Sequence, residues 1–245
     1  MIKDNTIYGI HPVLEALRSN TSLEKIVLQK GKQTSAIQEL KELASNKNIK
    51  LQFLPVAAFR KYKDLNHQGV LAFQSPIDLI SIEQLIDNCT GKEKLGFLLL
   101  DGITDVRNLG AIIRNAESMD FDAVIIPENN SAMINETVVK TSAGAIYNLT
   151  ICKVNHLVDA LMYLQAEAID CFAITEKSDN VIYEHRFSDK VAFVIGDEGK
   201  GISKKVLNLC GKLIKIPLTG KTSSLNVSVA AGIALYERNK QLDLV

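Results

Sequence analysis

Five short, almost uninterrupted apolar runs recur from residue 96 onward, and they constrain the fold more than any other feature of the sequence. Runs of this kind are typical of strands in a parallel sheet that is covered on both faces. They span residues 96–100, 123–126, 171–174, 191–195 and 213–216. Helical patterns lie between them at 109–119, 155–168 and 202–210. The alternation predicts a doubly wound α/β domain, in which ligands bind at the carboxyl ends of the strands.

The first 75 residues predict a separate, small α/β domain. Strand-like segments at 25–29, 51–54 and 70–73 alternate with a turn and helix at 7–18 and a helical pattern at 34–45. Apolar residues recur at helical spacing in the second of these segments, which supports the assignment. The alternation of strands and helices is that of a compact α/β unit.

Residues 76–95 are expected to form a linker, because Pro76 interrupts the pattern and only a weak helix precedes the polar stretch 90–94. Charge differs on the two sides of this segment. Residues 1–75 hold 11 Lys or Arg and 6 Asp or Glu, whereas the rest of the chain holds 17 and 22. The neutral total therefore hides a basic first domain, where a polyanion is expected to make its first contact.

The candidates for contact with RNA are cationic side chains and one histidine of the first domain. They are Lys30, Lys32, Arg60, Lys61, Lys63 and His67. Tyr62 is available for stacking on a base. Each lysine also fits a solvated helix face that contacts nothing. The four histidines of the chain lack the spacing of metal ligands, so no metal site is predicted.

Composition favours a cytoplasmic protein with a sizeable core. The chain has 245 residues, of which 47% are hydrophobic, and this length suffices for two domains of ordinary size. No run approaches the ~20 apolar residues of a membrane span, and the first residues lack the apolar run of a signal peptide. The four cysteines are widely spaced without a CxxC pair, which is typical of buried thiols in a reducing compartment.

The loop after the first apolar run leads into a helix that is expected to start near Asn108. Arg114 lies close to the predicted apolar face of that helix. A guanidinium held there suits a phosphate, which it can bind through two parallel hydrogen bonds. Asn108 alone also fits a helix N-cap, and Gly110 fits a glycine required for close packing.

The loop after the run at 191–195 carries three glycines, at positions 196, 199 and 201. It resembles a dinucleotide-binding loop only superficially, because the GxGxxG spacing is absent. Asp197 and Glu198 also occupy the place where a pyrophosphate needs neutral backbone. These carboxylates suit a cationic ligand, or hydroxyl and amino groups. Taken alone, the loop also fits an ordinary connection between a strand and a helix.

A third informative stretch, 215–232, reads as the end of a strand, a turn rich in Thr, Gly and Ser, and a helix capped by Ser223 or Ser224. The first turn of that helix places Asn226 and Ser228 among apolar and small residues. Polar groups in such surroundings need specific partners, because burying them unpaired is costly. A hydrogen-bonded helix cap would satisfy them, and so would a ligand.

Together, the three segments resemble the SpoU (TrmH) family of RNA ribose 2′-O-methyltransferases, within the SPOUT class. Residues 108–110 with Arg114 are similar to the first family motif, and residues 196–199 are similar to the second. Residues 216–218 and 224–228 are similar to the third. The order and spacing of the motifs agree with the family across the second domain.

The first domain extends the resemblance to nearly the whole chain. Tyr8-Gly9-Ile10-His11 and His67-Gln68-Gly69-Val70 are similar to the first domain of the RlmB-like branch, which methylates a guanosine ribose in 23S ribosomal RNA. The resemblance implies a ribosomal-protein-like RNA-binding domain over 1–75 and a methyltransferase domain with a deep trefoil knot over 96–245. It also implies a homodimer packed through the knotted domains, close to the small residues 230–232.

The resemblance implies that the cofactor is S-adenosylmethionine and that no metal takes part. The residues that it implies for the cofactor pocket are Gly196, Ile216, Leu218 and Leu225. Those that it implies for catalysis are Arg114, Asn108, Glu198, Ser224 and Asn226. Arg114 is expected to hold a phosphate and stabilise the developing alkoxide. A guanidinium with a pKa above ~12 does not readily surrender a proton, so that phosphate or a water would accept the proton of the 2′-hydroxyl.

Other functions remain open on the sequence alone. The substrate could be transfer RNA, or the chain could be a non-catalytic relative that binds RNA or the ribosome. The presence of both Arg114 and Asn226 argues against the non-catalytic reading. A nucleotide-dependent oxidoreductase is a third alternative, and the acidic loop at Asp197 and Glu198 disfavours it.

Overall fold

The computed structural model describes residues 6–19, 21, 23–47, 49–75, 77–221 and 224–244. Two compact units divide the chain between Asp78 and Leu79, close to the predicted end of the first domain at residue 75. Each unit has a sheet and a buried core of its own.

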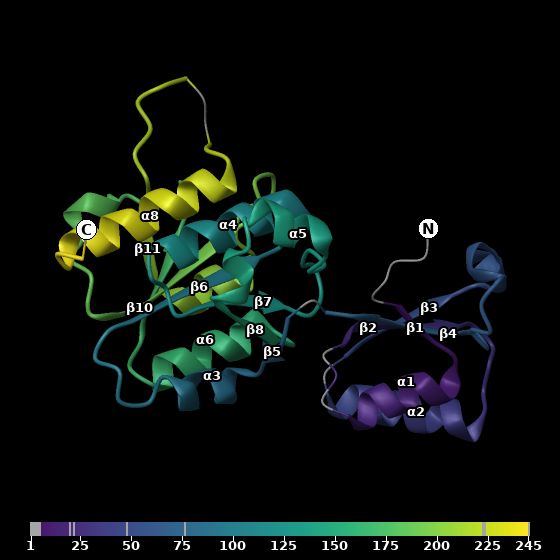
Figure 1. The fold of residues 1–245 in the computed structure, drawn as a ribbon. Coiled ribbons are helices and arrows are strands. Elements are labelled where there is room, and N and C mark those ends of the chain that lie inside the picture. Colours follow the sequence, from purple (N-terminus) through teal and green to yellow (C-terminus); the bar gives the residue numbers. More distant parts are fainter. Residues whose placement is uncertain are drawn as a thin grey trace. The chain divides into compact units, whose positions relative to one another are not determined.

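The first unit is a four-stranded sheet with helices on it. Its elements are β1 (Thr6–Tyr8), α1 (Ile10–Arg18), β2 (Leu23–Gln29), α2 (Ser35–Asn46), β3 (Lys50–Leu54), the 3₁₀ helix η1 (Val56–Tyr62) and β4 (Val70–Gln74). The strand order is β1-β4-β2-β3, with β2 and β3 parallel and the other pairs antiparallel. Figure 1 shows α1 and α2 on one face of this sheet, and Phe59 of η1 packs against Val27 and Leu71 on the other.

The second unit is built on a seven-stranded sheet in which every neighbouring pair is parallel. Its elements are β5 (Leu79–Ile80), α3 (Ile82–Asn88), β6 (Leu95–Asp101), α4 (Val106–Ser118), β7 (Ala123–Pro127), α5 (Glu136–Thr141), η2 (Ala145–Tyr147), β8 (Thr150–Val154), α6 (Leu157–Ala166), β9 (Asp170–Ile174), η3 (Ile182–Glu184), β10 (Lys190–Gly196), α7 (Lys204–Cys210), β11 (Lys212–Ile214) and α8 (Val227–Gln241). The strand order is β11-β9-β10-β6-β7-β8-β5. The predicted α/β fold with a parallel sheet is confirmed.

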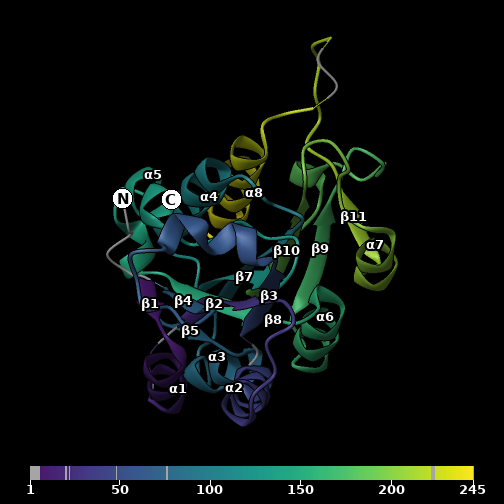
Figure 2. The ribbon, with the colours of Figure 1, turned by 90° about the vertical axis from the view of Figure 1, so that its right-hand side faces the viewer.

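Helices cover both faces of the seven-stranded sheet, as the continuous apolar strands require. Figure 1 shows α4, α5 and α8 on one face and α3 and α6 on the other, and Figure 2 shows α7 beside α6. The central strand β6 is completely enclosed, since Phe97, Leu98, Leu99 and Leu100 are at most 1% exposed. All four cysteines are buried free thiols, as the sequence predicts.

The segment predicted as a linker, 76–95, contributes to the second unit. β5 pairs with β8 in parallel, and α3 buries Leu85 in the core of this unit. A capping box between Ser81 and Gln84 defines the start of α3. The helical pattern is short, and Leu85 is its only fully buried residue, so the sequence gives a weak signal for an element that the sheet nevertheless holds in place. Pro76 lies outside the described residues.

The last helix, α8, is tied to the amino ends of two central strands. The guanidinium of Arg238, which is 3% exposed, donates to the carbonyl oxygens of Leu95 and Asp189 at 3.2 and 2.8 Å. It also lies 5.5 Å from the ring centre of Phe121. The amide of the next residue, Asn239, donates to the carbonyl of Met119 at 2.7 Å. These bonds fix α8 along the face of the sheet that carries α4.

Candidate active site

The loops that carry the first two motifs meet where the strand order reverses. From β6 the chain continues to β7 and β8 on one side of the sheet, and it returns through β9 to β10 on the other. The carboxyl ends of β6 and β10 are therefore neighbours, with Asp101 paired to Gly196. In open α/β sheets this reversal point is where ligands bind.

Asp105, rather than Asn108, caps the first turn of α4. Its Oδ1 accepts hydrogen bonds from the backbone N–H groups of Arg107 and Asn108 at 2.9 and 2.8 Å. The capping role considered for Asn108 is thus wrong. Because Asp105 satisfies the backbone of this turn, the side-chain amide of Asn108 is left to contact other segments.

Asn226 caps α8, and the expectation of a cap at Ser223 or Ser224 is wrong. The Oδ1 of Asn226 accepts from the backbone N–H and the hydroxyl of Ser228 at 3.0 and 2.5 Å. The helix therefore begins at Val227, later than the polar turn suggests. Ser224 is exposed two residues before the cap, and Ser223 lies outside the described residues.

One carboxylate oxygen of Glu198 joins the three motif segments. Its Oε1 accepts from Asn108 Nδ2 at 3.3 Å, from Asn226 Nδ2 at 2.6 Å and from the backbone N–H of Val227 at 3.0 Å. Asn226 Nδ2 also donates to Asn108 Oδ1 at 3.0 Å. A carboxylate at the first N–H groups of α8 is favourable, because that end of the helix carries partial positive charge. The partners that the sequence requires for Asn226 are therefore Glu198, Asn108 and Ser228.

The turn between β10 and α7 depends on the absence of a side chain at Gly196. A Cβ there would lie 2.2 Å from the carbonyl carbon of Gly201, so no larger residue fits. Asp197 stabilises the same turn, because its Oδ1 accepts from the N–H groups of Gly199 and Lys200 at 2.9 and 3.0 Å. Of the two acidic residues, Asp197 organises its own loop and Glu198 contacts the other motifs.

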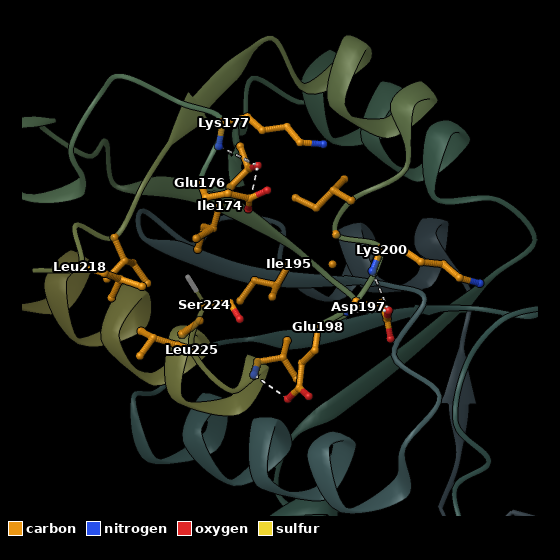
Figure 3. A pocket seen from close by; sticks show the side chains of 18 residues that line it. Ile174, Glu176, Lys177, Ile195, Asp197, Glu198, Lys200, Leu218, Ser224 and Leu225 are labelled. Atoms are coloured by element: carbon orange, nitrogen blue, oxygen red, sulfur yellow. Dashed lines mark hydrogen bonds between the residues drawn. The ribbon is translucent and has the colours of Figure 1, made fainter. Parts of the chain in front are cut away.

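We call the hydrogen bonds from Asn108, Asn226 and Val227 to Glu198 the joint at Glu198. A cavity of about 370 Å³ lies beside this joint (Figure 3). The residues that the resemblance implies for a cofactor all line it, namely Gly196, Ile216, Leu218 and Leu225. Ser224 and Glu198 line it as well. The volume falls in the range of about 300–1,000 Å³ that is usual for small-molecule sites.

The segment after β9 completes the cavity lining, and the sequence reasoning did not single it out. It contributes Thr175, Glu176 and Lys177, together with Ile174 at the end of the strand. The signal was present in the sequence, because residues that follow the carboxyl end of a parallel strand are expected at the ligand site. The cavity lining is therefore mixed, with apolar side chains beside the acidic residues Glu176, Asp197 and Glu198 and the basic residues Lys177 and Lys200.

Arg114 lies apart from the joint at Glu198. Six residues along an α-helix place it about 120° around α4 from Asn108. Its side chain is exposed, in contrast to the expected position close to the apolar face. It lines a second hollow, of about 610 Å³, together with Ser228, Val229 and Tyr236. Within one chain, Arg114 therefore lines a different hollow from Glu198.

The residues predicted to contact RNA divide into two groups. Lys30, Arg60, Lys61 and Lys63 are exposed in the first unit. Lys32 and His67 make internal contacts instead: Lys32 Nζ donates to the carbonyl of Gln68 at 2.7 Å, and His67 Nδ1 accepts from the N–H of Gly69 at 2.8 Å. Burial, followed by the charge of Lys32, lowers the pKa of His67.

Within the described ranges, no three His, Cys, Asp or Glu side chains are grouped so that they could hold a metal ion. No helix in this part of the chain is both long and apolar enough to cross a membrane.

Two family matches cover both units of the chain. Residues 96–236 match the SpoU rRNA Methylase family, and residues 6–78 match the RNA 2′-O ribose methyltransferase substrate-binding family. The first match includes all three motif segments. A nucleotide-dependent oxidoreductase is therefore excluded as a reading of the glycine-rich loop.

Relatives match along almost the whole chain. A Staphylococcus aureus protein assigned to the TrmH family of tRNA/rRNA methyltransferases is 35% identical over 96% of both chains. The Escherichia coli 23S rRNA (guanosine-2′-O-)-methyltransferase RlmB is 33% identical over 96% of this chain and 98% of its own.

A solved structure shares the fold. The SpoU methyltransferase AviRb of Streptomyces viridochromogenes, in complex with AdoMet, superposes with a TM-score of 0.62 at 20% identity, covering 97% of this chain and 90% of its own. The motif segments, the family matches and the relatives all give the same assignment. The chain belongs to the SpoU (TrmH) family of RNA ribose 2′-O-methyltransferases.

Proposed function

We propose that this chain transfers a methyl group from S-adenosylmethionine to the ribose 2′-hydroxyl of a guanosine in 23S ribosomal RNA. The E. coli relative RlmB is named for that reaction and is similar over nearly the full length of both chains. The observation that carries the proposal is the joint at Glu198, because it gathers the three motif segments beside one cavity.

The lining of the cavity suits S-adenosylmethionine. The apolar side chains of Ile216, Leu218 and Leu225 would contact the adenine, while backbone groups at Gly196 would contact polar atoms of the cofactor. The carboxylate of Glu198 favours a cationic ligand at the same site. When bound, the cofactor supplies a methyl group made electrophilic by its sulfonium.

Two side chains near the joint would orient the ribose. Ser224 is exposed and lines the cavity, and Asn108 keeps one amide N–H beyond the bond that it donates to Glu198. In the reaction the 2′-oxygen forms a bond to the methyl carbon as the bond from that carbon to sulfur breaks. The hydroxyl proton passes to the neighbouring phosphate or to a water, because a guanidinium such as Arg114 is a poor proton acceptor.

We further propose that the chain works as a homodimer through the exposed face of α8. Val229, Ile233 and Tyr236 are 49, 37 and 50% exposed and follow one another at helical spacing. Arg114 borders the same face in the second hollow. Covering this face with a second copy would bury the apolar side chains and place Arg114 at a subunit boundary, where its charge can hold the phosphate beside the target ribose.

The domain roles follow from the same assignment. The first unit is proposed as the RNA substrate-binding domain and the second as the methyltransferase domain, with the trefoil knot of the SPOUT class in its last part. The family matches over 6–78 and 96–236 support this division. The proposed knot would involve the segment between β11 and α8, which supplies Ile216, Leu218, Ser224 and Leu225 to the cavity.

The reaction is tested with labelled S-adenosylmethionine and unmodified 23S ribosomal RNA, with transfer RNA in a separate reaction. The proposal expects label on a guanosine 2′-oxygen of the ribosomal RNA. Label on transfer RNA would transfer the assignment to that substrate, and label on a base nitrogen would overturn ribose methylation. Cofactor binding without methyl transfer to any RNA would identify a non-catalytic relative.

Arg114→Ala separates chemistry from cofactor binding in the same assay. Because Arg114 lies outside the cavity, its loss is expected to abolish methyl transfer while the dissociation constant for S-adenosylmethionine changes less than about twofold. Arg107→Ala is a matched control, since Arg107 is an exposed arginine on the same helix. Full activity of the Arg114 variant would contradict the proposed role.

A further inference from the structure

One end of the sheet in the first unit gathers four connections. β1, β2 and β3 all end there, and β4 begins there, because β1 and β2 both run antiparallel to β4 and β3 runs parallel to β2. We call this surface the loop end, and it consists of residues 8–11, 30–34 and 55–69. The two short motifs of the first domain, at 8–11 and 67–70, are therefore neighbours although about sixty residues separate them.

Hydrogen bonds lock the two motifs together. The N–H of Gly9 donates to the carbonyl of Val70 at 3.1 Å, and the N–H of Ile10 donates to Gln68 Oε1 at 3.0 Å. Lys32 Nζ holds the carbonyl of Gln68. The side chain of Gln68 thus supports the start of α1, while Lys32, in the loop after β2, holds the backbone carbonyl of Gln68.

The backbone at Gln68 is in an unfavourable conformation. Its φ is 50°, and that of Gly69 is 76°, so two consecutive residues are left-handed. At position 69 a glycine is favoured, because a Cβ there would lie 3.0 Å from Gln29 Cβ. Gln68, in contrast, adopts the left-handed conformation with a full side chain. A non-glycine residue in this region is strained and persists where its surroundings hold it, often at a binding site. Gln68 is exposed, its Oε1 accepts from Ile10 N, and its amide N–H groups are the remaining donors.

The charge of the loop end favours a polyanion. It carries five basic residues and one acidic residue, namely Lys30, Lys32, Arg60, Lys61, Lys63 and Asp64. Two exposed rings lie on the same surface: Tyr8, which is 39% exposed, and His11 in the first turn of α1. Cations that hold phosphates, next to rings and amide donors that reach bases, are the combination with which proteins bind unpaired RNA.

We propose that the loop end binds unpaired nucleotides of the substrate RNA. Lys30, Arg60 and Lys63 contact phosphates, and Gln68 and Tyr8 contact a base, the first by hydrogen bonding and the second by stacking. Lys32 and His67 are positioning residues, since their polar atoms are used to hold the turn at Gln68. The inference rests on the proposed RNA substrate and adds to it the surface that recognises that RNA.

The phosphate contacts are tested by exchanging two charges in the full-length protein. Lys30→Glu with Lys63→Glu is compared with Lys47→Glu and Lys50→Glu, which change the net charge equally at the opposite end of the same sheet. The loop-end pair is expected to weaken binding of a 23S ribosomal RNA fragment at least tenfold and to lower the salt dependence by about one unit per lost contact. The control pair is expected to change affinity less than about threefold.

The base contact is tested by Gln68→Glu. This change keeps the oxygen that accepts from Ile10 N and removes the two amide donors. We expect affinity for the ribosomal fragment to fall about fivefold or more while affinity for a scrambled single strand of equal length falls less. Equal losses for both RNAs would overturn base recognition, and equal losses for both lysine pairs would overturn the loop end as the phosphate site.

A readout of chemistry distinguishes this inference from the proposed function. If wild-type protein methylates RNA and the loop-end variants keep its KM, the loop end is not the RNA-binding surface, and the proposed methyltransferase function is unaffected. If wild-type protein binds the fragment through the loop end but transfers no methyl group to any RNA, the proposed function fails and the surface stands. Wild-type protein that binds no RNA would overturn both. An unchanged circular dichroism spectrum and unfolding transition in every variant verify that the first unit, which carries the substitutions, is folded.

Discussion

The side chain of Asn226 has no hydrogen-bonding capacity left for a substrate. Its Nδ2 donates to Glu198 and Asn108, and its Oδ1 accepts twice from Ser228. An amide offers two donors and two acceptor positions, so all four are used. We therefore propose, in place of the expected direct bond to the ribose, that Asn226 positions Glu198 against the first turn of α8.

Asn226→Asp isolates this bridging role from helix capping. The variant keeps an oxygen for the cap but places a second carboxylate beside Glu198 Oε1, where the amide nitrogen lies at 2.6 Å. Two carboxylates at that distance repel, and the pKa of the pair rises because one proton must be shared. We expect methyl transfer at pH 8 to fall about 100-fold, since small displacements of reacting groups have effects of that size.

The pH profile is the measurement that identifies the cause. Activity of Asn226→Asp relative to wild type should recover as the pH is lowered through the raised pKa of the pair, because the shared proton removes the repulsion. Asn226→Ala serves as the control, because it loses both cap and bridge but adds no second carboxylate beside Glu198. A pH-independent deficit in the Asp variant would contradict the bridging role.

Gly110 tests close packing between α4 and α5. A Cβ at this position would lie 1.8 Å from Thr141 Oγ1, so Gly110→Ala forces the two helices apart. We expect the free energy of unfolding to fall by about 1–3 kcal/mol, the usual cost of overpacking, measured by urea denaturation. Gly220→Ala is the control, because no atom lies within 4 Å of its added Cβ. Unchanged stability of the Gly110 variant would show that α5 moves freely.

At the scale of elements, the question for α3, residues 82–88, is whether it stabilises the core of the second unit or acts as a linker. Leu85 is 1% exposed, whereas Asp87 on the same helix is exposed. Leu85→Ala should lower the free energy of unfolding by about 2–5 kcal/mol through lost burial and the cavity left behind. Asp87→Ala should change it by less than about 0.5 kcal/mol in the same urea titration. Equal, small effects would restore the linker interpretation.

The elements that the sequence predicts correctly are those with long periodic or continuous apolar patterns. The five apolar runs correspond to β6, β7, β9, β10 and β11. β8 and β5 were not predicted. The first includes the polar residues Thr150 and Lys153, and the second is two residues long. Both become strands because a neighbouring strand offers hydrogen bonds, and a local pattern does not contain that information.

The meeting of two motif loops was predictable from the sequence, but the contacts between their side chains were not. The strand order places the loops of Asn108 and Glu198 together, which the rule for parallel sheets anticipates. The partner of Asn226 could not be read from the sequence, because 28 residues separate it from Glu198 and 118 from Asn108. The exposure of Arg114 depends on how α8 packs against α4, and this too is a tertiary property.

At the scale of the whole molecule, the exposed face of α8 should set the oligomeric state. Ile233→Glu introduces a charge among Val229 and Tyr236 and is expected to weaken a dimer at least tenfold, which corresponds to about 1.4 kcal/mol. Sedimentation velocity over a concentration series measures the change. Met162→Glu is the control, because Met162 is 56% exposed on α6. A wild-type protein that remains monomeric throughout the series would contradict the proposed dimer.

The length of chain between the joined segments has a consequence for biosynthesis. Asn108 and Glu198 emerge from the ribosome before Asn226, and Arg238 emerges later still. A nascent chain that ends before residue 226 therefore contains every strand of both sheets but lacks the helix whose first turn completes the joint. The arrangement at Glu198 therefore cannot be completed before Asn226 has been synthesised, so a shorter nascent chain lacks the assembled methyl-transfer site even when its first unit is complete.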